Sequence, residues 1–195
     1  MEENEYYKNV ADRTQRNVEV DFEMLKNENS DIIGWIKIPG TRINYPIVQS
    51  ANNGKYLHTL FNGKHGDAGC LFADCHTDPF KSTLTIIYGH RMKDGSMFAD
   101  LGKYKNTSFA KKHSSIVLFT PEKSYQLEIV LFATISALDS VYNIYFTSAE
   151  SVYDLLQKQA HYTYNRPKPN EKLVMLSTCT YEFENARYVL LCKLQ

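Results

Sequence analysis

The sequence predicts a mainly β protein that folds as a closed or nearly closed β-barrel. About seven short runs rich in β-branched and aromatic residues are typical of strands, and few segments have the spacing of helices. The composition agrees, because 14 tyrosines and 10 phenylalanines suit the half-buried surface of a sheet. A chain of 195 residues can bury one substantial core. We therefore expect a barrel domain over residues 31–195, with a helical segment over residues 1–30 packed on it.

The predicted strands are short apolar runs bounded by turn signals. They are residues 34–38, 45–48, 83–88, 116–119, 125–135, 173–178 and 188–194. Pro46 places its strand at an edge of the sheet or at the strand's own start, because proline cannot donate to a ladder. Residues 121–123 predict a hairpin between the strands that they join. Residues 49–80 are predicted to form a long irregular stretch.

Three segments have the features of helices. Val18, Phe22 and Leu25 are spaced as one apolar stripe within an acidic N-terminal region. Residues 97–104 fit a short helix. Residues 148–162 fit a longer one, because they begin with a serine that can cap the helix and carry acidic side chains near that end. This last helix would lie before the penultimate strand.

Charge and cysteine content exclude several kinds of protein. The 22 basic and 22 acidic residues balance, which argues against a nucleic-acid partner bound by bulk charge. No apolar run is long enough for a membrane span, which taken alone favours a cytoplasmic protein. Four cysteines are too few for a disulfide scaffold. Cys70, Cys75 and His76 lack the tight paired spacing of a structural zinc site, so we expect no metal and no cofactor.

Cys179 lies just after the penultimate predicted strand and shares a face with Met175 and Ser177, because side chains alternate along a strand. Most free cysteines are small buried hydrophobic residues, and on position alone this alternative stays open for Cys179. A reactive thiol needs partial exposure and an electropositive setting. Arg187 supplies that setting if the last two strands are neighbours.

Arg187 would share a face with Val189 and Leu191, where an unpaired charge is costly. It must therefore form a structural ion pair or line a cleft. Cys192 points to the opposite face, so we interpret it as core packing and exclude it from the site.

His90 follows the strand over residues 83–88, and Gly89 before it permits a close approach of the backbone. A histidine at the end of a buried strand can meet a thiol, because loops on a rigid frame commonly carry chemistry. The other histidines lie in polar stretches and are expected to be solvated. They are His58, His65, His76, His113 and His161.

The sequence Leu-Ser-Thr-Cys at residues 176–179, followed by Arg187, and the sequence Tyr-Gly-His at residues 88–90 form one ordered series. Together they resemble the signature of the sortases. The matches that resemble class B of that family in particular lie at residues 34–36, 44–49, 56–57 and 92–101. The resemblance covers roughly residues 18–194, and it makes Cys179 the expected nucleophile.

The resemblance implies an eight-stranded barrel in a cysteine transpeptidase of Gram-positive bacteria. It also implies attachment to the cell membrane, on the extracytoplasmic face, through an N-terminal helix. This chain shows no such anchor, so we expect that it has been removed and set the cytoplasmic interpretation aside. The implied substrate is a C-terminal sorting motif of a surface protein, roughly Asn/Ser/Pro-Pro-x-Thr-Gly/Asn, and the implied acceptor is an amine of a peptidoglycan precursor.

The implied mechanism is covalent catalysis in two steps, with a thiol nucleophile, an imidazole acid/base and a guanidinium that stabilises the oxyanion. The implied catalytic residues are Cys179, His90 and Arg187, and the substrate-contacting residues expected beside them are Ser177, Tyr181 and Glu184. Two other functions stay open. A hydrolytic cysteine protease would need an Asn or Asp to orient the histidine, and none is obvious. A non-enzymatic β-barrel binding module would keep Cys179 buried and inert.

Overall fold

The computed structural model describes residues 2–16 and 19–195. Its barrel strands are β3 (Ile32–Lys37), β4 (Asn44–Val48), β5 (Leu71–Ala73), β6 (Leu84–Tyr88), β7 (Ile116–Phe119), β8 (Ser124–Ser136), β10 (Leu173–Cys179) and β11 (Ala186–Leu194). They follow the order β11-β10-β6-β5-β4-β3-β7-β8, and pairing between β8 and β11 closes the barrel. A further strand, β9 (Ala160–Thr163), extends the sheet beside β8. The predicted fold class, a closed barrel of about eight strands, is confirmed.

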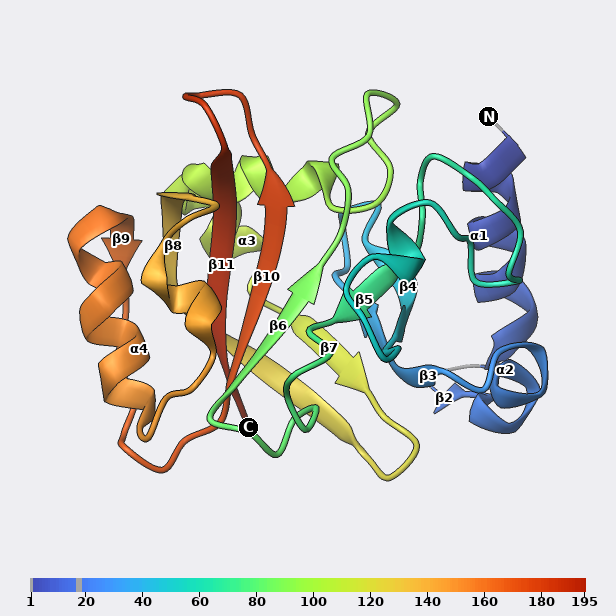
Figure 1. Ribbon diagram of the computed structural model, residues 1–195, viewed down its shortest axis with the longest axis horizontal. Coiled ribbons are helices and arrows are strands. Elements are labelled where there is room, and N and C mark those ends of the chain that lie inside the picture. The colour runs from blue at the N-terminus through green and yellow to red at the C-terminus, as the bar shows by residue number, and fades with distance from the viewer. Residues whose placement is uncertain (1, 17–18) are drawn as a thin grey trace.

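Helices and short 3-10 turns lie around this barrel. They are α1 (Glu2–Thr14), α2 (Phe22–Glu28), α3 (Thr107–Lys112), α4 (Ala149–Leu156), η1 (Lys55–Leu57), η2 (Ala99–Lys105), η3 (Ser140–Asn143) and η4 (Gln157–Gln159). Figure 1 shows α1 and α2 at one end of the molecule and α4 at the other. A small separate pair, β1 (Gln15–Arg16) and β2 (Glu19–Val20), joins α1 to α2. Within the part of the chain that the structure describes, each helix is too short or too polar to cross a bilayer.

Two hydrophobic clusters hold the fold, one inside the barrel and one on its outer face. Val174 and Leu176 of β10 belong to the first, together with Trp35. Met175 belongs to the second, where α4 contributes Val152. The predicted alternation along β10 is therefore confirmed, and the face that carries Met175 is the face on which Ser177 and Cys179 also lie. Cys192 is buried in the first cluster, as the sequence predicts.

The N-terminal helix α1 packs through its buried residues. The Tyr7 hydroxyl donates to the Gly69 carbonyl, and its ring lies edge-on to Tyr45 of β4, with centroids 5.4 Å apart. The Glu3 carboxylate accepts hydrogen bonds from the amides of Asp67 and Ala68 at 3.0 and 2.8 Å. These contacts join α1 to the segment before β5.

The N-terminal apolar stripe is partly outside the described structure, because Val18 belongs to the residues left undescribed. Phe22 and Leu25 lie in α2, which begins at Phe22. The preceding Asp21 caps it, because its side chain accepts a hydrogen bond from the Met24 amide at 2.9 Å.

Three expectations about the strands and the long helix were wrong. Strand β5 lies within the stretch predicted to be irregular, and it is held by pairing with β4 and β6. Strand β4 is not at an edge, because it lies between β3 and β5. Pro46 is tolerated because the pairing of β4 with β5 begins only at the next residue, Ile47. The helix predicted over residues 148–162 ends at Leu156, because Tyr162 and its neighbours pair with β8 instead. The predicted serine cap of this helix is present.

Candidate active site

Strand register brings three expected site residues to one end of the barrel. Cys179, the last residue of β10, lies directly opposite Arg187 in the antiparallel pair with β11. Strand β6 runs parallel to β10, with Ser177 beside Tyr88, so His90 follows β6 at the level of Cys179. In Figure 1 the arrowheads of β6 and β10 mark this end of the barrel.

Two hydrogen bonds fasten the end of β6 to β10. The Gly89 amide donates to the Ser177 carbonyl at 3.2 Å, and the Thr178 hydroxyl donates to the Gly89 carbonyl at 2.8 Å. A Cβ atom at Gly89 would lie 2.4 Å from the Leu71 side chain and 2.7 Å from the Phe98 ring, so a larger residue would displace two buried side chains. The close approach predicted for Gly89 is therefore present, and it fixes the segment that carries His90.

A pocket of about 290 Å³ lies over these strand ends. The expected site residues that line it are His90, Ser177, Cys179 and Arg187. Ser177 is buried, whereas the other three are partly exposed. A partly exposed thiol beside a guanidinium is the setting that a reactive cysteine needs.

The His90 ring is held by the backbone of η1. Its Nε2 lies 2.8 Å from the Leu57 carbonyl oxygen, which can only accept, so Nε2 carries the hydrogen. Nδ1 is then the ring atom left for proton exchange. The His58 ring stacks beside it, with centroids 5.8 Å apart, and His65 lies beside His58 at 6.1 Å. His58 and His65 are exposed, as expected, but their stacking beside His90 does not follow from the sequence.

Arg187 is free to act on a ligand. Among the described residues, no carboxylate forms an ion pair with its guanidinium, whose one hydrogen bond, from Nη1, goes to the adjacent Ala186 carbonyl at 3.0 Å. The sequence left two roles open for the Arg187 guanidinium, a structural ion pair or a place in the wall of a cleft. The structure favours the second, because Arg187 lines the pocket.

Tyr142 of η3 is a pocket residue that the sequence analysis missed. Its hydroxyl lies 2.8 Å from the Ser177 hydroxyl, and its ring stacks on Tyr88 with centroids 6.2 Å apart. Burial raises the pKa of Tyr142 to about 12, although the Ser177 bond and the charge of Arg187 oppose the shift. The phenol is therefore neutral near pH 7 and orients Ser177 through a neutral hydrogen bond.

The four cysteines differ in exposure and acidity. Cys70 also lines the pocket, but it is buried and its burial raises the pKa of the thiol to about 12. Burial likewise raises the pKa of Cys192 well above its ordinary value. Cys75 and Cys179 are partly exposed, and of these only Cys179 lines the pocket. Cys179 is thus the accessible thiol at the strand ends.

The loop between Cys179 and Arg187 lies outside the pocket. Tyr181 is 82% exposed, and neither it nor Glu184 lines the pocket. The Arg91 guanidinium lies over the rings of Tyr181 and Tyr188, 5.8 Å from each centroid, and so joins this loop to the segment after His90.

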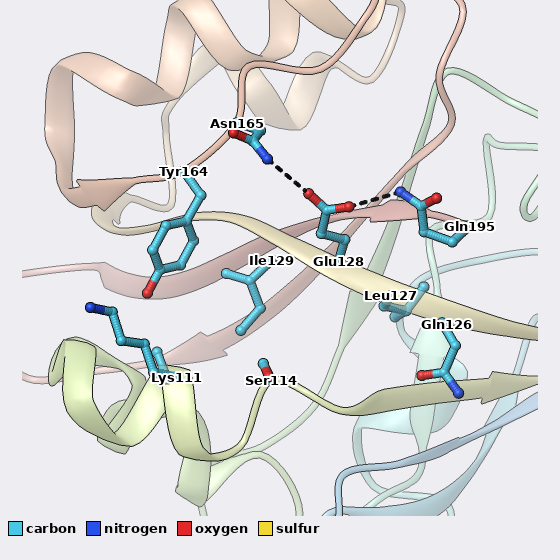
Figure 2. A pocket seen from close by; sticks show the side chains of 10 residues that line it. Lys111, Ser114, Gln126, Leu127, Glu128, Ile129, Tyr164, Asn165 and Gln195 are labelled. Atoms are coloured by element: carbon cyan, nitrogen blue, oxygen red, sulfur yellow. Dashed lines mark hydrogen bonds between the residues drawn. The ribbon is translucent and has the colours of Figure 1, made fainter.

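A larger hollow of about 530 Å³ lies between α3 and β8 (Figure 2). In it the Glu128 carboxylate accepts hydrogen bonds from Asn165 and Gln195 at 3.4 and 2.9 Å. The described residues that line this hollow include no cysteine and no histidine. Chemistry rather than size therefore identifies the pocket at the strand ends as the candidate active site.

Comparisons with known proteins agree with this geometry. The family model described as the sortase domain matches residues 36–195. A sortase B from Listeria monocytogenes is 38% identical over 199 residues, which cover 96% of this chain and 80% of that protein. The crystal structure of sortase B from B. anthracis in complex with AAEK1 gives a TM-score of 0.84 at 31% identity and covers 99% of this chain and 96% of that one.

A structure of a Staphylococcus aureus sortase B-substrate complex gives a TM-score of 0.83 at 28% identity, with coverage of 98% of this chain and 92% of that one. The family match spans most of the barrel, and identity to a sortase B exceeds 30% along nearly the whole chain. This protein therefore belongs to the sortase family of cysteine transpeptidases, within its class B.

Proposed function

We propose that this sortase cleaves a C-terminal sorting motif, roughly Asn/Ser/Pro-Pro-x-Thr-Gly/Asn, after its threonine and transfers the surface protein to an amine of a peptidoglycan precursor. The resemblance of the motifs to class B sortases supports this specificity. A peptide substrate is supported by the Staphylococcus aureus relative, whose structure is described as a substrate complex. The reaction would take place at the outer face of the cell membrane.

In the first half-reaction the Cys179 thiolate attacks the threonine carbonyl carbon. The carbonyl becomes an oxyanion, and Arg187 stabilises it with a guanidinium fork that carries a permanent charge. His90, as the imidazolium, gives its Nδ1 proton to the departing amine while the C–N bond breaks. The products are a thioester on Cys179 and a neutral amine on the released C-terminal fragment.

In the second half-reaction the acceptor amine attacks the thioester carbonyl, His90 takes up the amine proton, and the Cys179 thiolate leaves. Ser177 would contact the substrate from the same face, with its hydroxyl oriented by Tyr142. Tyr181 and Glu184 would contribute from the exposed loop only when a bound peptide extends beyond the pocket.

The single observation that carries these roles is the register that pairs Cys179 with Arg187 beside the His90 segment. Cys179→Ala should abolish cleavage of a fluorogenic sorting-motif peptide and leave the circular dichroism spectrum unchanged. Cys75→Ala, which removes the other partly exposed thiol, is the matched control; assayed beside the parent with a metal chelator present, it should cleave at the parent rate. Cleavage that persists in Cys179→Ala would overturn the assignment.

A further inference from the structure

The turn after β5 gathers three different metal-ligating side chains outside the catalytic pocket. The Asp74 Oδ1 atom lies 3.0 Å from His76 Nδ1, and the Cys75 Sγ atom lies 3.4 Å from the same nitrogen. One ligand atom from each residue lies within 4.8 Å of the others. These are consecutive residues, so the turn itself sets their spacing.

The spacing fits the edges of a tetrahedral zinc centre. Zinc–sulfur, zinc–nitrogen and zinc–oxygen bonds of about 2.3, 2.05 and 2.0 Å imply an S···N edge of about 3.6 Å and an N···O edge of about 3.3 Å. The corresponding distances here are 3.4 and 3.0 Å. Two of the three edges therefore lie within a few tenths of an ångström of the tetrahedral values, and all three ligand atoms lie within 4.8 Å of one another.

A second layer of hydrogen bonds already orients the carboxylate. Asp74 is 4% exposed, and its Oδ2 atom accepts hydrogen bonds from Asn53 Nδ2 at 2.9 Å and from the Tyr88 hydroxyl at 3.0 Å. Asn53 also accepts from the Cys75 amide at 2.8 Å, and Gln49 donates to the Asp74 carbonyl at 2.8 Å. Such outer partners fix ligand orientation in metal sites.

We propose that Asp74, Cys75 and His76 bind one zinc ion, with a fourth position open to water or to an external ligand. Thiolate and imidazole donors select zinc and its borderline neighbours over calcium or magnesium, which prefer oxygen. Cys75 is partly exposed and His76 is exposed, so the ion can enter from solvent. The sequence predicts no metal here, because the set Cys70, Cys75 and His76, with Cys70 as the third donor, lacks the tight paired spacing of a structural zinc site and no second pair lies elsewhere. Cys70 is buried and contacts the Pro46 carbonyl, and Asp74 takes that place.

A single side chain, that of Tyr88, would connect the bound ion to the catalytic pocket. Tyr88 donates to Asp74 and also lines the pocket, where its ring stacks on Tyr142. Metal binding would therefore fix Tyr88 through Asp74, directly before the segment that carries His90.

The test uses Co²⁺ as a spectroscopic substitute for zinc on the full chain kept reduced. The parent and Cys179→Ala should each bind one Co²⁺ and show a thiolate-to-cobalt charge-transfer band. Cys75→Ser should lose that band, and His76→Ala should bind more weakly than the matched control His65→Ala. Cys75→Ser and His76→Ala keep the Asp74 carboxylate and the hydrogen bonds that it accepts from Asn53, Tyr88 and the His76 amide, so we expect the fold to be retained. Absence of the band in the parent, or its loss in Cys179→Ala instead of Cys75→Ser, would overturn the proposal.

Competition by Zn²⁺ against alkylation gives an independent readout that does not depend on activity. At a Zn²⁺ concentration about 100 times the Kd, alkylation of Cys75 should slow about 100-fold, because only the unbound fraction reacts. Peptide mapping by mass spectrometry separates Cys75 from Cys179. Protection of Cys179 alone, or equal labelling of Cys75 with and without Zn²⁺, would contradict a site at Asp74, Cys75 and His76.

Discussion

Thr178 ties the strand that carries Cys179 to the segment that carries His90, so removal of its hydroxyl should affect both stability and catalysis. The hydroxyl is buried and donates to the Gly89 carbonyl at 2.8 Å. Thr178→Val leaves that carbonyl without this partner, which should lower the free energy of unfolding by about 1–3 kcal/mol. For a chain of this size, each kcal/mol lowers Tm by roughly 2–4 °C.

The catalytic effect of Thr178→Val should exceed what lost stability explains. Gly89 directly precedes His90, and a misplacement of about 1 Å in a reacting group can cost on the order of 100-fold in rate. We therefore expect a lower kcat for cleavage of a sorting-motif peptide, with KM little changed.

Thr85→Val is the matched control. Thr85 is a buried threonine of β6 whose hydroxyl accepts from the Phe80 amide at 2.8 Å, away from the pocket. Urea unfolding and steady-state cleavage should show a similar loss of stability in both variants, but a lower kcat only in Thr178→Val. If both variants keep the parent kcat, the Thr178 bond does not position His90.

The other predictions test separate groups. His90→Ala should lower kcat by about 10²–10⁴-fold, because the leaving amine no longer receives a proton; an unchanged kcat in steady-state cleavage would exclude His90 as the acid. Arg187→Lys keeps the charge but loses the fork, so we expect kcat to fall by about 10²–10³-fold; a parent-like rate would leave Arg187 as a counter-charge only. Burial raises the pKa of Asp74, but the hydrogen bonds that its carboxylate accepts together lower the pKa by more than burial raises it. The pKa of Asp74 is therefore below its ordinary value. Stabilisation from a depressed pKa is present above the unfolded value of about 3.9 and is lost as pH falls through the folded value. Urea unfolding with a chelator should therefore show a deficit in Asp74→Asn that shrinks on acidification, and a deficit independent of pH would contradict this.

Much of the barrel is predictable because strand signals are local. The apolar run over residues 83–88 and the two runs joined by residues 121–123 form β6, β7 and β8 as expected. β5 is only three residues long, and it exists because β4 and β6 lie on either side of it. The end of α4 also depends on a long-range contact. Residues 160–163 form backbone hydrogen bonds with β8 as a strand and so do not continue the helix.

In the active site too, the local patterns are predictable from the sequence and the long-range contacts are not. Alternation places Ser177 and Cys179 on one face, and the register with β11 places Arg187 opposite, so this part of the pocket follows from strand periodicity. The contacts of Tyr142 with Ser177 and of Leu57 with His90 join segments more than 30 residues apart, and no local pattern encodes them. Residues 56–57 are part of the resemblance to class B sortases, but the sequence does not show what they do. In the structure the Leu57 carbonyl accepts the hydrogen bond from His90.

Transpeptidation at Cys179 requires a thioester on this cysteine that an amine resolves faster than water does. The measurement is mass spectrometry of the intact enzyme, followed by peptide mapping, after rapid mixing with a sorting-motif peptide. We predict an added mass equal to the N-terminal peptide fragment on Cys179, slow loss in buffer, and faster loss when a cell-wall-like amine is supplied. The reason is that a bound acceptor has a high effective concentration that unpositioned water lacks. An adduct on another cysteine, or a decay rate and product unchanged by a broad range of amines, would contradict transpeptidation at Cys179.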